Sequence, residues 1–195
     1  MKALKGKKGF TLIEVIVILA VIAILAAVLT PMIIGYIADA RVRAAESDTK
    51  TIAAAVQAFN RDMRDWPIWA VGTARKATNA KYDGLQSKDG DTPAVTGTTI
   101  PGSIDFIDDH LVTNVQLYPT TGGSKWAGPY LEKVSRDPWG NKYYIDVAGL
   151  QPANVGGFKV AWVASAGPNK TLQTAFGQTG PSITIGGDDV VFRIK

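Results

Sequence analysis

The sequence predicts an α+β fold in which a long N-terminal helix packs on a small C-terminal antiparallel β-sheet. Two observations indicate this fold. Residues 10–38 form a nearly continuous apolar run, and short segments rich in β-branched and aromatic residues fill the last third of the chain. A helix and a sheet that each carry an apolar face can bury both faces against each other. The chain has 195 residues without internal repeats, so we expect one globular unit beside the apolar segment.

Composition narrows the class of protein. The chain contains no cysteine, which excludes a disulfide framework and any thiolate metal site. The net charge of +4 comes from four lysines within residues 1–9, and the rest of the chain has 17 basic and 17 acidic side chains. Residues 10–195 therefore have no net charge, whereas nucleic-acid-binding proteins usually carry an excess of basic residues. We expect no nucleic-acid partner.

The apolar run is long enough to cross a membrane, because about 20 helical residues span the hydrocarbon core. A secretory signal peptide has a shorter apolar region with its small residue afterwards. Here the small residue, Gly9, precedes the run, so a cut at Gly9 leaves the helix on the mature protein. The preceding lysines predict a cytoplasmic N-terminus.

Glu14 is the only charged residue of the run. A carboxylate within a membrane helix is costly unless headgroups solvate it or a positive group pairs with it. Cleavage after Gly9 would create such a positive group, the amine of Phe10. In a stack of parallel subunits, Glu14 could meet the amine of its own chain or that of a neighbour.

The segment KGFTLIEVIVILAVIAILAAVLTP, residues 8–31, resembles the class III signal of type IV pilins and pseudopilins. The resemblance implies the pilin fold and a prepilin peptidase that cuts between Gly9 and Phe10 and methylates the Phe10 amine. It also implies assembly into a helical homopolymer, with Phe10, Glu14 and Pro31 as assembly residues. Proline weakens a helix interior, and the family analogy implies local melting before Pro31 in the filament.

Beyond the membrane segment the helix should continue as an amphipathic half over residues 39–66. Apolar residues recur there at three- and four-residue steps, which places them on one helix face. Pro67 should end the helix, because the residue before a proline is pushed out of helical geometry. The expected face contains Val42, Ala45, Thr49, Ile52, Ala53, Val56, Phe59, Met63 and Trp66.

Residues 67–128 show no sustained periodicity and predict a variable loop region. Within it, SIDFIDDHLV suggests a short helix capped by Ser103. We interpret His110, the only histidine, as a surface residue.

Residues 129–195 predict the β-sheet and an acidic loop. The pattern of β-branched and aromatic residues bounded by glycine or proline predicts four strands. They cover 142–147, 157–165, 182–185 and 190–194.

The segment WAGPYLEKVSRDPWGNKYYI, residues 126–145, resembles the region before the sheet in the major pseudopilins of type II secretion. We interpret it as structural: Asp137 and Pro138 favour a turn, and Trp139 supplies a large apolar anchor.

ASAGPNK and GGDDVVF resemble the calcium-binding loop of the same family. The resemblance implies calcium ligands at Asn169, Asp188 and Asp189, with a backbone oxygen of Ala166 as a further donor. Calcium prefers six to eight hard oxygens. Asn169 replaces an aspartate of the family pattern and removes a charge, so the competing interpretation is a polar loop closed by turn hydrogen bonds.

No catalytic constellation or phosphate loop is present in the sequence, so we expect no enzyme. The first functional hypothesis is a pseudopilin of type II secretion, whose periplasmic fibre acts as a piston for protein export. Its partners would be an inner-membrane assembly platform and minor pseudopilins at the tip. The second is a type IV pilin whose surface filament serves adhesion, motility, DNA uptake or electron transfer. A third is a membrane-anchored binding module.

Overall fold

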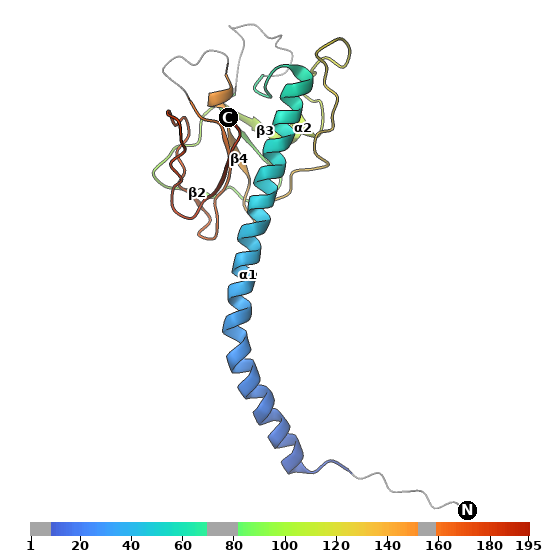
Figure 1. Ribbon diagram of the computed structural model, residues 1–195, viewed down its shortest axis with the longest axis vertical. Helices are drawn as coiled ribbons and strands as arrows, with labels where there is room; N and C mark the ends of the chain where they lie inside the picture. Colours follow the sequence, from blue (N-terminus) through green and yellow to red (C-terminus); the bar gives the residue numbers. More distant parts are fainter. Residues whose placement is uncertain (1–8, 70–81, 152–158) are drawn as a thin grey trace, which may run out of the picture. The chain divides into compact units, whose positions relative to one another are not determined.

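The computed structural model describes residues 9–69, 82–151 and 159–195 (Figure 1). The chain divides into two compact units, one ending at Ala40 and the other covering Arg41–Lys195. A single helix, α1 (Leu12–Met63), contributes to both units. The remaining elements all belong to the second unit.

The second half of α1 packs through the predicted face. Eight of its residues are buried, and the face is confirmed except that Val42 and Trp66 are only partly covered. The helix ends at Met63, before the predicted end at Trp66, because Arg64 adopts a left-handed backbone with φ of 52°. The buried residues are Ala45, Thr49, Ile52, Ala53, Ala55, Val56, Phe59 and Met63.

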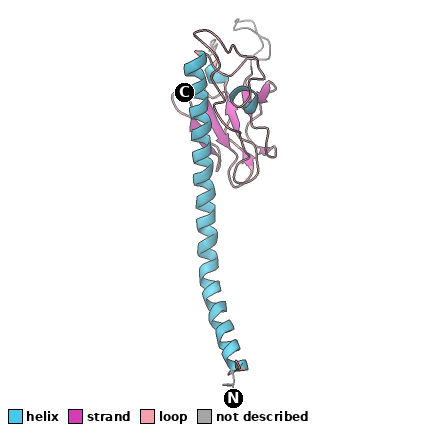
Figure 2. Ribbon diagram, turned by 90° about the vertical axis from the view of Figure 1, so that its right-hand side faces the viewer, coloured by secondary structure: helices cyan, strands magenta, loops and turns pink. Residues whose placement is uncertain are grey.

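A five-stranded sheet packs beside α1, as Figure 2 shows. Its order is β3-β1-β4-β5-β7. Three pairings are antiparallel, whereas β1 and β3 are parallel, so the sheet is mixed rather than purely antiparallel. The strands are β1 (Gly84–Gln86), β3 (Ile104–Phe106), β4 (Tyr144–Asp146), β5 (Trp162–Ser165) and β7 (Val190–Arg193).

Both faces of the sheet are buried, because successive side chains of a strand point to opposite sides. Ile145 and Val163 belong to the core cluster that contains Phe59 of α1. Tyr144 and Trp162 belong to a second cluster with Leu172, which partly buried side chains such as Phe176 cover.

Two sequence predictions about strands are wrong. Residues 182–185 form no strand; the side chain of Gln178 binds both the N–H and the C=O of Thr184, which takes the place of a strand partner. Residues 67–128 are more than a loop, since they supply β1, β3 and α2 (Ile107–Leu111). The smaller elements are β2 (Ala94–Val95), β6 (Thr171–Leu172) and the 3-10 helix η1 (Ala148–Leu150), and β2 pairs with β6.

The environment of His110 also differs from the prediction. Ser103 caps no helix, because residues 104–106 pair with β1 and α2 begins only at Ile107. His110 is fully buried. Its Nδ1 lies 2.6 Å from the Tyr118 hydroxyl and its Nε2 lies 3.3 Å from Asp105 Oδ2. Burial lowers the pKa of His110 despite that carboxylate.

The turn at residues 137–141 is structural, but its anchor is Asp137 rather than Trp139. Trp139 is only partly buried. Asp137 is buried, and its Oδ1 accepts hydrogen bonds from the backbone N–H groups of Trp139 and Asn141. Its Oδ2 accepts the Ser165 hydroxyl of β5 at 2.6 Å. The carboxylate therefore ties the turn to the sheet.

Candidate assembly site

The first turn of α1 is closed by a capping box. The helix begins at Leu12, so Thr11 is the N-cap and Glu14 is the third helical residue. Glu14 Oε2 accepts the backbone N–H and the hydroxyl of Thr11, both at 2.8 Å, and the Glu14 N–H donates back to Thr11 Oγ1 at 3.4 Å. This reciprocal pattern satisfies N–H groups that a helix start leaves without intrahelical partners.

The cap leaves part of Glu14 available. Both Thr11 contacts use Oε2, and no hydrogen bond to Oε1 is found among the described residues. Phe10 is 82% exposed, and nothing lies within 4 Å of a Cβ placed on Gly9. Both residues of the predicted cleavage position, Gly9 and Phe10, are therefore exposed among the described residues.

The helix residues before Ala40 expose an apolar surface on every side. All of residues 10–40 are exposed, including the large apolar side chains of Ile13, Val17 and Leu29. By length and composition α1 includes a segment able to cross a membrane, and none of that segment is buried. A helix that is apolar all round belongs in lipid or inside a larger assembly.

Pro31 lies inside this exposed segment, and α1 continues through it without a break. Proline donates no N–H, so one carbonyl of the preceding turn loses its helical partner. The Thr30 hydroxyl donates to the carbonyl of Ala26 at 2.7 Å, a contact that tends to bend helices. The local sequence thus weakens the helix just before Pro31.

The predicted calcium ligands lie in two adjoining loops. Asp188 Oδ2 accepts the Asn169 N–H at 3.1 Å, and Asn169 Oδ1 accepts the Thr171 N–H at 2.6 Å. A Cβ on Gly167, whose φ is 67°, would lie 2.2 Å from the Asp188 carbonyl oxygen, so this approach requires glycine. The loops are therefore held together by the candidate ligands themselves.

Asp189 is the strongest candidate ligand of this set. It is buried, and its Oδ2 accepts the N–H groups of Gln173 at 2.9 Å and Thr174 at 2.5 Å. Its Oδ1 is buried without a well-formed hydrogen bond in the part of the chain that the structure describes. Burial raises the pKa of Asp189. An unsatisfied buried carboxylate oxygen fits a cation, whereas the described residues contain no group of three or more acidic, histidine or cysteine ligands.

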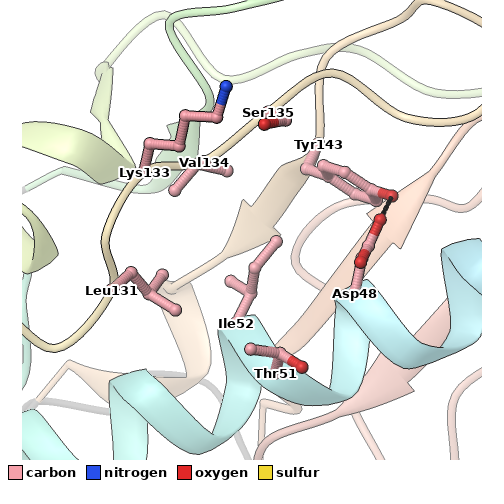
Figure 3. A pocket seen from close by; sticks show the side chains of 8 residues that line it. All are labelled: Asp48, Thr51, Ile52, Leu131, Lys133, Val134, Ser135 and Tyr143. Carbon is pink, nitrogen blue, oxygen red and sulfur yellow. Dashed lines mark hydrogen bonds between the residues drawn. The ribbon is translucent and has the colours of Figure 1, made fainter.

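A small pocket separates α1 from the chain before β4 (Figure 3). Its volume is about 120 Å³, and Asp48, Ile52, Leu131 and Tyr143 are among its lining residues. The Tyr143 hydroxyl donates to Asp48 Oδ2 at 2.8 Å, the contact drawn in Figure 3. Burial raises the pKa of Tyr143, so it stays a neutral donor. The pocket holds a contact between helix and sheet rather than a catalytic group.

The structure thus brings together Phe10 and Glu14 in one segment, and Asn169, Asp188 and Asp189 in another. The leader before Gly9, with its lysines, lies outside the described residues. Sequence reasoning missed the role of Thr11, although Thr-x-x-Glu before an apolar run is the signature of a capping box.

Comparisons with known proteins agree with these features. The prokaryotic N-terminal methylation motif matches residues 4–30, and the type II secretion system protein G family matches residues 109–173. The chain is similar to the type II secretion system core protein G of Pseudomonas aeruginosa, with 27% identity over 79% of this chain and 80% of the relative. It is also similar to the core protein G of Escherichia coli, with 25% identity over 89% of this chain and 90% of the relative.

No solved structure matches the chain significantly. The fold, with one long helix packed on a small sheet, is nevertheless the one that the sequence resemblance predicts. The methylation motif, the protein G match and the fold point in the same direction. The chain is similar to the type II secretion protein G family in residues 109–173 and carries the N-terminal methylation motif in residues 4–30.

Proposed function

We infer that the protein is a structural subunit of a type II secretion pseudopilus and polymerises through its N-terminal hydrophobic helix. One observation carries this conclusion: residues 10–40 present an apolar surface, and none of these residues is buried in the described part of the chain. The same surface suits lipid before assembly and other copies of the helix afterwards. The fibre formed in this way acts as a piston in protein export.

The protein G relatives favour this function over a type IV pilin. The family is a structural one, and we propose that this chain also catalyses no reaction. The sole histidine supports this proposal, because it is fully buried against Asp105 and Tyr118 and out of reach of a substrate.

The proposed maturation starts at the exposed bond between Gly9 and Phe10. A prepilin peptidase cuts this bond and methylates the new Phe10 amine. The amine then pairs with Glu14 of a neighbouring subunit through Oε1, while Oε2 keeps its capping contacts with Thr11. A charge pair of this kind removes the cost of carrying a carboxylate into an apolar filament core.

The proposed location before assembly is the inner membrane, with a cytoplasmic N-terminus and a periplasmic C-terminal unit. The lysines of the leader support this orientation, because basic residues stay on the cytoplasmic side. The assembly platform and minor pseudopilins are the proposed partners. The weakened helix before Pro31 is proposed to melt locally in the filament.

Calcium is proposed as a weakly bound structural ion between the loops 166–173 and 186–189. Asp188 and Asp189 would supply carboxylate oxygens, and Asn169 an amide oxygen. The orphaned Oδ1 of Asp189 supports this assignment. Bound calcium would stabilise the loops through mass action on the folded state.

The function is tested by expressing the full chain in a bacterium with a type II secretion system and shearing fibres from the cells. We expect fibres whose main component is this chain, with a mass that begins at methylated Phe10. Gly9→Leu should leave uncleaved precursor in the membrane. Fibres that lack the chain, or a Gly9→Leu variant of normal mature mass, would contradict the proposal.

The calcium proposal has a separate test. Thermal unfolding of the detergent-solubilised full chain should shift upward with calcium and return with chelator. Asp189→Asn should abolish the shift, whereas Asp91→Asn, an exposed acid outside these loops, should retain it. An unchanged melting temperature on addition of calcium would contradict the calcium proposal.

A further inference from the structure

Residues 173–187, here called the strap, cover the face of the sheet opposite the one that packs on Phe59. The strap contains no helix and none of the strands. Its Phe176 ring packs on the sheet, with its centroid 4.9 Å from that of Trp162 and 6.3 Å from that of Tyr144. Both of these sheet residues are fully buried. The strap therefore shields the second core cluster from solvent.

The middle of the strap is fastened by hydrogen bonds at Gly177 and Gln178. The carbonyl of Gln178 accepts the Val160 N–H, just before β5, at 3.1 Å. The Gly177 N–H donates to Asp146 Oδ2 at 2.6 Å, which is the shorter of the two contacts. Asp146 lies in β4, the central strand of the sheet. A side-chain carboxylate of the sheet is therefore an anchor for the strap.

Asp146 places a carboxylate under the strap without a cation bound to it. The residue is fully buried, and its second oxygen, Oδ1, accepts the Ala148 N–H at 2.9 Å. None of the ion pairs in the described part of the chain includes Asp146. Burying an ionised carboxylate costs much more than burying a neutral one, and hydrogen bonds from two N–H groups offset only part of that cost.

The charged groups that face Asp146 are Lys159 and Asp83. Lys159 favours the ionised form of Asp146, and Asp83 opposes it. The strands on either side contribute uncharged residues, because Asp146 pairs in register with Gly84 of β1 and Trp162 of β5. Burial outweighs the hydrogen bonds and Lys159, and it raises the pKa of Asp146 to about 6. The closed strap therefore favours the protonated carboxyl.

We propose that the strap is a proton-linked cover, which closes more tightly when Asp146 is protonated and opens more often when Asp146 is ionised. Opening brings water to the carboxylate, so the open state carries the negative charge at lower cost than the closed state. The closed state thus binds more protons than the open state, and lowering the pH favours closure. Opening also lifts Phe176 from Trp162 and Tyr144. This inference concerns the second unit alone and does not depend on fibre formation.

Hydrogen exchange of backbone amides measures how often the strap opens. The detergent-solubilised full chain is exchanged at about pH 7.5 and about pH 5, on either side of the pKa of about 6, and the intrinsic exchange rate is divided out. In the open state the pKa of Asp146 should return to its ordinary value of 3.8. The ratio of open to closed strap should then be about tenfold larger at the higher pH. An equal ratio at both pH values, or a larger one in acid, would overturn the proposal.

Two variants assign the effect to Asp146. Asp146→Asn cannot ionise, so the ratio of open to closed strap should be the same at both pH values. Asp91→Asn removes an exposed acid outside the strap and should keep the tenfold difference. A pH dependence that survives in Asp146→Asn would assign the effect to another group and overturn the proposal.

A direct titration of the natural chain tests the same proposal without any substitution, and so does not depend on the folding of a variant. In the isotopically labelled full chain, the carboxyl carbon resonance of Asp146 should shift with a midpoint near pH 6. A midpoint near the ordinary value of 3.8 would show that the closed strap does not favour the protonated carboxyl, and the proposal would then be wrong.

Discussion

At the scale of single residues, three carboxylates hold local backbone segments in place. Glu14 closes the start of α1, Asp137 ties a turn to β5, and Asp189 holds the backbone of a neighbouring loop. Each accepts hydrogen bonds from groups that would otherwise lack partners. Charge-assisted hydrogen bonds of this kind are stronger than neutral ones.

Glu14 has two separable roles, capping and charge pairing. Glu14→Gln preserves a capping side chain but removes the charge, whereas Thr11→Ala removes the cap and keeps the charge. We expect Glu14→Gln to lower fibre yield strongly and Thr11→Ala to lower it weakly. Yields of sheared fibres measure this. Normal assembly of Glu14→Gln would leave capping as the sole role.

Asp137 should be the most sensitive residue of the 137–141 turn. Replacing it with alanine leaves two N–H groups and a hydroxyl without their acceptor, which should destabilise the protein by about 3 kcal/mol. Thermal unfolding in detergent measures the loss. Glu132→Ala, an exposed acid nearby, should change stability by less than about 0.5 kcal/mol. Equal effects of both variants would contradict the role of Asp137.

His110 should make the second unit sensitive to acid. Its pKa is lowered in the folded state, so below about pH 6.5 the unfolded state binds more protons than the folded state. The free energy of unfolding therefore decreases as the pH is lowered. The groups facing it are Asp105, Tyr118, Asp109 and Tyr82.

The His110 effect is isolated by comparison with His110→Gln. The folded pKa of Asp146, raised to about 6 by burial, acts in the opposite sense but is shared by both proteins. The natural chain should lose up to about 1.4 kcal/mol more per pH unit below pH 6.5 than the variant. Identical slopes of stability against pH would show that the pKa of His110 is the same in the folded and the unfolded state, and would contradict this prediction.

At the scale of elements, α1 and β4, β5 and β7 are the parts that sequence predicts best. Their apolar periodicity is long or strongly β-branched, so the pattern alone is informative. The strands β1 and β3 are three residues each and lie among polar residues, and no periodicity marks them. Segment 182–185 has strand composition, but the Gln178 side chain takes its hydrogen bonds.

The candidate site divides in the same way. The predicted cleavage position and the predicted role of Glu14 both rest on a contiguous motif, which a single sequence displays in full. The burial of His110 depends on Asp105, Tyr118 and Trp126, which only the tertiary structure gathers. The groove between α1 and β7 likewise joins residues such as Val42 and Phe192, which lie far apart in the sequence.

The packing of α1 on the sheet depends most on Phe59. Its side chain is fully buried and contacts Tyr118 and Tyr130 edge-on at 4.9 and 5.6 Å. Phe59→Ala should cost about 3–5 kcal/mol through the cavity it leaves. Phe59→Leu should cost less, because it fills more of the space. Denaturant unfolding measures the free energy of unfolding of both variants. Small and equal losses would show that the packing of α1 does not depend on Phe59.

At the scale of the whole molecule, the two units have opposite solvent requirements. The second unit, from Arg41 onward, buries its own core, whereas residues 10–40 carry an apolar surface and are all exposed among the residues that the structure describes. Such a helix is stable in lipid and in a bundle of identical helices. The proposed transfer from a membrane to a fibre therefore requires no refolding of the second unit.

A helical reconstruction of the sheared fibre tests this account most directly. It should show residues 10–40 of many copies packed at the fibre axis, with the Phe10 amine of one subunit against Glu14 of the next. A fibre held together only by residues 41–195, with Glu14 remote from every neighbouring Phe10, would contradict the account.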